Sequence, residues 1–164
     1  GPGFASSPVD LPATYADLTA AQALIHRREA WIHLTPIREA HEGEVTQVFR
    51  DFLDAGARES EEDYQSALAL QRACQAQLDA VFADVDLLLA PSAPGVAPEG
   101  LSSTGNPVFQ RIWTALGVPC LGFPAAWSEG LPLGLTLIAR PGADRQLIAD
   151  ARAILALGQF KEPL

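Results

Sequence analysis

Apolar residues in the first half of the chain recur at helical spacing. From Asp17 they repeat every three to four residues until Pro36, which predicts one amphipathic helix that the proline interrupts. A second stretch of apolar residues with the same spacing predicts another helix. It ends at Gly56, a residue that readily takes the left-handed conformation of a helix C-cap. Ser60, followed by three acidic residues, predicts the start of a third helix with an apolar face that runs to Phe82. We expect this third helix to be the longest.

Continuous apolar runs replace helical spacing in the second half. Residues 85–91 predict a short strand covered on both faces. Residues 118–127 and 133–139 predict two further strands, antiparallel or neighbouring, joined by a short polar turn. A last helix, capped by Asp144, should end before Gly158. Strands bounded by helices indicate an α/β fold.

The segment between residues 91 and 107 separates these patterns and contains four prolines and three glycines. So many backbone breakers predict a long loop, and such loops in compact domains are often functional. Asn106 followed by Pro107 predicts the cap and first residue of a short helix that Gly117 ends. The expected buried face of that helix is Phe109, Ile112, Trp113 and Leu116.

Composition narrows the class of protein. At 164 residues, with 48% hydrophobic and 19% charged residues, the chain fits one globular domain. The apolar stretches are too short to cross a bilayer, so no membrane association is expected and the chain should be soluble and cytoplasmic. A net charge of −9 disfavours nucleic acid as a partner.

Two cysteines and three histidines raise the possibility of a thiol or metal hydrolase. Cys74 and Cys120 both fall in apolar patterns, which predicts buried packing rather than nucleophilic thiols. His26 and His33 could share a helix face, but neither an HExxH motif nor a cysteine ligand accompanies them. We expect no metal and no cofactor.

Six blocks, taken in order along the chain, resemble the C-terminal part of the amidase signature family. They cover about residues 9–157 without large insertions. The blocks are Glu29-Ala30, Asp63-Tyr64, DLLLAPSAPGVAP, TGNPVFQRIWTALGVPCLGFPAAW, GLPLGLTLIAR and DRQLIADARAIL.

The resemblance implies a mixed β-sheet sandwiched between α-helices. It places the C-terminal segment of an amidase domain at residues 9–158, with terminal tails at 1–8 and 159–164. Family members hydrolyse carboxamides with a Ser, a cis-Ser and a Lys that lie before the matched region. This chain has one lysine, Lys161, outside the match, and its paired serines, at 6–7 and 102–103, have no positioned base. No catalytic residue is therefore expected within the chain.

The resemblance also places the loop and the helix after it near the acyl or leaving-group pocket. Thr104, Asn106, Phe109 and Trp113 are therefore candidate substrate-binding residues, although the aromatic pair could equally belong to the core and Asn106 could be only a cap. The implied partners are the remaining N-terminal part of the amidase, a small-molecule amide and, in a homodimer, a second copy. The alternative function is a non-catalytic, amidase-derived module for binding or dimerisation.

Overall fold

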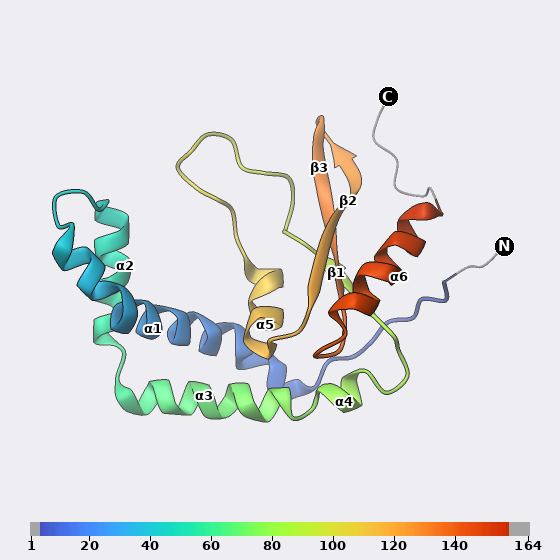
Figure 1. The fold of residues 1–164 in the computed structure, drawn as a ribbon, viewed down its shortest axis with the longest axis horizontal. Helices are drawn as coiled ribbons and strands as arrows, with labels where there is room; N and C mark the ends of the chain where they lie inside the picture. Colours follow the sequence, from blue (N-terminus) through green and yellow to red (C-terminus); the bar gives the residue numbers. More distant parts are fainter. Residues whose placement is uncertain (1–3, 158–164) are drawn as a thin grey trace.

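A computed structural model of the chain describes residues 4–157. Helices dominate the first half and a small sheet forms in the second (Figure 1). In chain order the elements are η1 (Ala13–Asp17), α1 (Leu18–Ala40), α2 (Gln47–Arg58), α3 (Glu61–Gln75), α4 (Leu78–Val81), β1 (Leu88–Pro91), α5 (Val108–Leu116), β2 (Cys120–Ser128), β3 (Leu131–Ile138) and α6 (Asp144–Ala156).

The sheet has the strand order β1-β3-β2, and both pairings are antiparallel. Successive residues of a strand face opposite sides, so Leu137 packs with residues of α6 while Ile138 packs with residues of α3, α4 and α5. Figure 1 shows α5 and α6 on either side of the sheet and the α1, α2 and α3 helices extending away from it. The predicted α/β class and the helices on both sides are confirmed, and the described strands contain no parallel pair.

Helix α1 does not end at Pro36, contrary to prediction, and continues to Ala40. The proline removes one helical hydrogen bond, but contacts with α2 hold the last turn in place. The Arg38 guanidinium donates to Asp54 Oδ1 of α2 at 2.7 Å. Helix α1, with 23 residues, and not α3, with 15, is the longest helix of the described chain.

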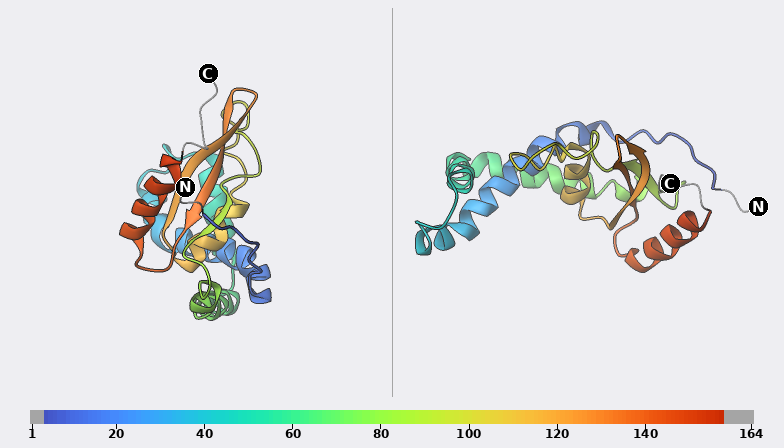
Figure 2. Two further views of the ribbon diagram at one scale, coloured as in Figure 1. Left: turned by 90° about the vertical axis from the view of Figure 1, so that its right-hand side faces the viewer. Right: turned by 90° about the horizontal axis from the view of Figure 1, so that it is seen from above.

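Helix α2 is capped by the side chain of Thr46 and passes through Gly56, so the predicted C-cap at this glycine is wrong. Gly56 lies where α2 crosses α1, and a Cβ atom added there would stand 2.0 Å from the carbonyl oxygen of Arg27. The glycine therefore serves close helix packing instead of ending a helix. The views in Figure 2 show α1 and α2 side by side as an arm.

Helix α3 begins at the predicted place, with Ser60 Oγ accepting from the Asp63 amide at 3.0 Å. It ends at Gln75, earlier than expected, and α4 forms a separate turn. At the break the buried Tyr15 hydroxyl donates to the carbonyl oxygen of Cys74 at 2.9 Å. In a continuous helix that oxygen would accept from the Leu78 amide, so a contact from a distant part of the chain accompanies the end of α3.

Strand β1 is shorter than predicted and is not covered on both faces. Leu89 pairs with Leu137, which lies under α6, yet Leu89 is 56% exposed. Helix α6 packs on β2 and β3, and β1 lies at the edge of the described sheet. Asp144 is the first residue of α6 and makes no capping bond, contrary to prediction, while Gly158 lies outside the described residues.

The turn between β2 and β3 confirms the predicted antiparallel pair. Glu129 and Gly130 both have positive φ angles, of 53° and 79°, as tight hairpin turns require.

None of the helices in the described part of the chain combines the length and apolar composition of a bilayer span.

Candidate functional site

A polar cluster lies at the end of β1, where the long loop begins. Ser92 Oγ and Thr136 Oγ1 are 2.8 Å apart. Gln110 Nε2, from the first turns of α5, donates to the carbonyl oxygen of Ser92 at 3.0 Å and to Thr136 Oγ1 at 3.1 Å. It also lies 3.3 Å from the carbonyl oxygen of Pro91. One side chain thus ties α5 to both β1 and β3.

Thr136 is the only buried polar residue in the described part of the chain, at 3% exposure. A buried hydroxyl is costly without hydrogen-bond partners, and here Gln110 and Ser92 supply them. The cluster therefore stabilises the junction of the sheet, α5 and the loop.

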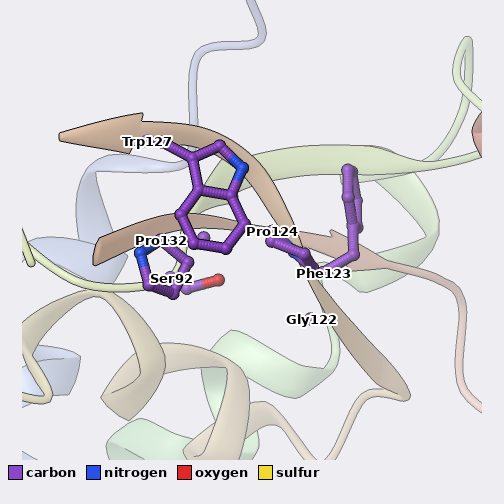
Figure 3. Close-up of a pocket in the computed structure, with 7 residues that line it drawn as sticks. Ser92, Gly122, Phe123, Pro124, Trp127 and Pro132 are labelled. Carbon is purple, nitrogen blue, oxygen red and sulfur yellow. The ribbon is translucent and has the colours of Figure 1, made fainter. Parts of the chain in front are cut away.

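An open pocket of about 370 Å³ adjoins Ser92. Its lining is mostly apolar and comes from the β2–β3 hairpin: Gly122, Phe123, Pro124, Trp127, Pro132 and Gly134. In Figure 3 the Trp127 ring lies over Pro132 and Ser92, and the Phe123 ring stands apart from it.

Gly134 explains how Ser92 fits against the hairpin. A Cβ atom at this position would lie 2.9 Å from both Cβ and Oγ of Ser92. The missing side chain therefore leaves the space that the serine occupies beside the pocket.

The predicted site residues fall into two environments. Thr104 and Asn106 are exposed in the loop, and Asn106 Oδ1 accepts from the Val108 amide at 3.0 Å, next to the start of α5. Phe109, the residue before Gln110, is 38% exposed. It therefore does not belong to the buried face predicted for this helix. Trp113 is 5% exposed and packs in the core with Leu116 and Ile138. Asn106 and Phe109 thus lie at the exposed start of α5, whereas Trp113 belongs to the core.

The cysteines differ from each other. Cys74 is buried, as predicted, whereas Cys120 is exposed, contrary to prediction, because it begins β2 on an uncovered part of the sheet. Burial raises the pKa of the Cys74 thiol above the ordinary value, and partial burial of the sulfur atom does the same for Cys120, although that residue as a whole is exposed. A raised pKa keeps a thiol protonated at neutral pH, which disfavours a nucleophilic role.

The histidines do not form a ligand set in the described residues, where no group of three His, Cys, Asp or Glu side chains converges. His26 instead contacts the ring of Phe52, with the ring centroids 5.1 Å apart. His41 lies 3.5 Å from a carboxylate oxygen of Glu44.

Comparison with known proteins gives this arrangement a context. The profile of the amidase family matches residues 7–148, which is most of the chain. The chain belongs to the amidase family. The matched residues include the loop, α5, the β2–β3 hairpin and the polar cluster of Ser92, Gln110 and Thr136. The candidate site therefore lies within the amidase region.

Individual amidase relatives agree with this assignment. The chain is 34% identical over 110 residues to a subunit of the glutamyl-tRNA(Gln) amidotransferase of Thermus thermophilus, a match that covers 62% of this chain and 23% of the relative. A crystal structure of an amidase superposes with a TM-score of 0.74 at 28% identity, covering 93% of this chain and 36% of that one. A bacterial aryl acylamidase of the amidase signature family shares the fold, with a TM-score of 0.63 at 20% identity and coverage of 87% and 34%. The chain thus spans well under half the length of these relatives.

Sequence reasoning missed the residues that make the polar cluster and the pocket. Thr136 was detectable as the one hydroxyl inside the apolar run 133–139. Ser92 follows directly on a predicted strand, a position where functional side chains are common. Trp127 is the last residue of the apolar run 118–127, and nothing in that run distinguishes it as a pocket residue.

Proposed function

We propose that this chain is the C-terminal segment of an enzyme that hydrolyses a carboxamide C–N bond to a carboxylate and ammonia or an amine. The observation that carries the proposal is the superposition with a solved amidase, in which nearly the whole of this chain matches about a third of the enzyme. A preceding segment would supply the nucleophilic Ser, the cis-Ser and the Lys that the family resemblance implies.

The proposed chemistry is acyl transfer through that serine. Its oxygen attacks the amide carbon while its proton passes, through the cis-Ser and Lys, to the leaving nitrogen, and the C–N bond breaks. Water then attacks the acyl-enzyme, releases the carboxylate and restores the serine hydroxyl. The sole lysine of this chain, Lys161, lies outside both the family match and the described residues.

This chain would contribute one wall of the substrate pocket. Thr104, Asn106 and Phe109 are our candidate contacts, because they are exposed around the start of α5. Trp113 would act from the core, by fixing the position of the helix that carries Phe109. No cofactor or metal takes part in the proposed reaction.

Activity of the gene product would test the proposal. The 164-residue chain and the polypeptide encoded by its whole reading frame would each be assayed for ammonia or amine release from a panel of carboxamides. We expect turnover only with the whole polypeptide. Turnover by the chain alone, or by neither protein, would contradict the proposal.

The pocket wall would be tested in the same polypeptide. We expect Phe109→Ala to raise KM several-fold with little change in unfolding, because it removes a half-exposed contact surface. Val48→Ala is the matched control, since this apolar side chain is 79% exposed on the distant α2. Equal effects of the two substitutions would remove Phe109 from the site.

A second candidate is a non-catalytic module that binds a partner or a second copy of the chain. Exposed apolar side chains on separate elements, including Leu89 on β1 and Ile37 on α1, would serve such a partner as well as they would serve a preceding segment of the enzyme. If this second candidate is correct, the whole polypeptide binds the same partner as the 164-residue chain and hydrolyses no amide.

A further inference from the structure

The orientation of the Gln110 amide follows from its neighbours. Two of its partners are carbonyl oxygens, those of Pro91 and Ser92, and a carbonyl oxygen only accepts hydrogen bonds. The amide must therefore present its NH2 group to them. The NH2 group has two hydrogens, and its two shorter contacts are those to the carbonyl oxygen of Ser92 at 3.0 Å and to Thr136 Oγ1 at 3.1 Å, so the threonine oxygen accepts from Gln110.

This orientation sets the direction of the next hydrogen bond. Thr136 is buried, and its remaining polar neighbour is Ser92 Oγ at 2.8 Å. If Ser92 donated to Thr136, the threonine hydrogen would be buried without an acceptor, which costs about 1–3 kcal/mol. The satisfied arrangement has Thr136 donating to Ser92.

The hydroxyl hydrogen of Ser92 is then free to donate outward. Ser92 is half-buried, lines the open pocket, and lies beside the rings of Trp127 and Pro132 (Figure 3). Successive donors in one direction polarise each other, so the chain from Gln110 through Thr136 strengthens Ser92 as a donor.

We propose that this pocket binds a small neutral group with an apolar, planar body and one hydrogen-bond acceptor oxygen. The body would lie against Trp127, Pro124 and Pro132, and the oxygen would accept from Ser92 Oγ. The volume of about 370 Å³ falls in the range of small-molecule sites. A neutral acceptor is favoured over a carboxylate because the protein carries a net charge of −9. The site goes beyond the proposed hydrolase function and is tested by binding alone.

The test uses the polypeptide as its gene encodes it, with acetophenone as the probe and ethylbenzene as the matched probe without an oxygen. Binding is followed by the NMR signal of the Trp127 indole N–H, which Trp127→Phe identifies. We expect both probes to shift this signal. Ser92→Ala should weaken acetophenone binding about fivefold to tenfold, the value of one hydrogen bond, and leave ethylbenzene binding unchanged.

Two further measurements keep the test independent of how well the variant folds. Ser102→Ala removes an exposed hydroxyl from the same loop and should change neither affinity. In the unsubstituted protein, the carbonyl carbon signal of labelled acetophenone should move to higher frequency on binding, as hydrogen-bond donation requires. An unshifted carbonyl signal, unchanged affinity in Ser92→Ala, or a silent Trp127 signal with both probes would each overturn the proposal.

Discussion

Single residues decide how closely the helices of this protein approach each other. Gly56 is buried in the last turn of α2, where the two nearest atoms of the opposing helix, Arg27 O and Arg27 C, belong to the backbone. A backbone atom yields much less readily than the end of a flexible side chain. The helix pair therefore depends on the absence of a side chain at this position.

We expect Gly56→Ala to lower the free energy of unfolding by about 1–3 kcal/mol, the usual cost of overpacking. Alanine is otherwise the better helix former, so intrinsic propensity alone would raise stability. Urea denaturation followed by circular dichroism would measure the change. Gly43→Ala is the control, because a Cβ atom there meets nothing within 4 Å. A Gly56→Ala protein as stable as the control would mean that α1 and α2 are not in close contact.

Among the elements, the β2–β3 hairpin is connected by a tight turn at Glu129 and Gly130. Gly130 suits the positive φ of its turn position, but Glu129 occupies the other, at φ 53°, where most residues are strained. Local chemistry at this turn therefore favours the hairpin only in part.

Replacing Glu129 with Asn should stabilise the protein by about 0.5–1 kcal/mol, because asparagine tolerates this conformation and suits such turns. Glu99→Asn is the matched control, an exposed glutamate of the long loop that is not at positive φ, and we expect it to change stability little. Both can be compared by urea denaturation. A gain equal in the two variants would reflect lost negative charge and not the turn.

The long helical pattern after Ser60 shows where periodicity misleads about element boundaries. Its apolar spacing continues through Leu78 and Phe82, and both side chains are buried as the pattern predicts. The backbone nevertheless breaks after Gln75, where Tyr15 reaches the Cys74 carbonyl across 59 residues of sequence. Periodicity predicts which side chains are buried, but it does not predict a contact between distant residues such as Tyr15 and Cys74.

Across the molecule, the sheet is incomplete at β1. In the described residues this strand pairs with β3 alone, which leaves its other edge open. An open edge with an exposed apolar side chain readily pairs with another strand. Leu89, on β1, is such a side chain.

We expect Leu89→Lys to reduce concentration-dependent association of the 164-residue chain, because a charge on an edge strand opposes pairing. In the whole gene product we expect the preceding segment to cover this edge, so the same change should bury a lysine there and lower stability. Sedimentation velocity and urea denaturation would measure the two effects. Leu101→Lys is the control, a fully exposed leucine in the loop, and an equal effect there would show that the β1 edge is not the contact surface.

The family was predicted from the resemblance of six sequence blocks. Local patterns along the chain were enough to predict the α/β class, two neighbouring strands joined by a turn, the long loop and most helix positions. These properties rest on spacing, caps and turn residues that act over a few positions, as at Ser60 and Gly117. The folded structure was needed to show that Pro36 lies inside a helix, that Gly56 lies at a helix crossing, and that the polar cluster of Ser92, Gln110 and Thr136 forms. These features depend on contacts between residues far apart in the chain. Such contacts produce no periodic pattern of apolar residues from which they could be predicted.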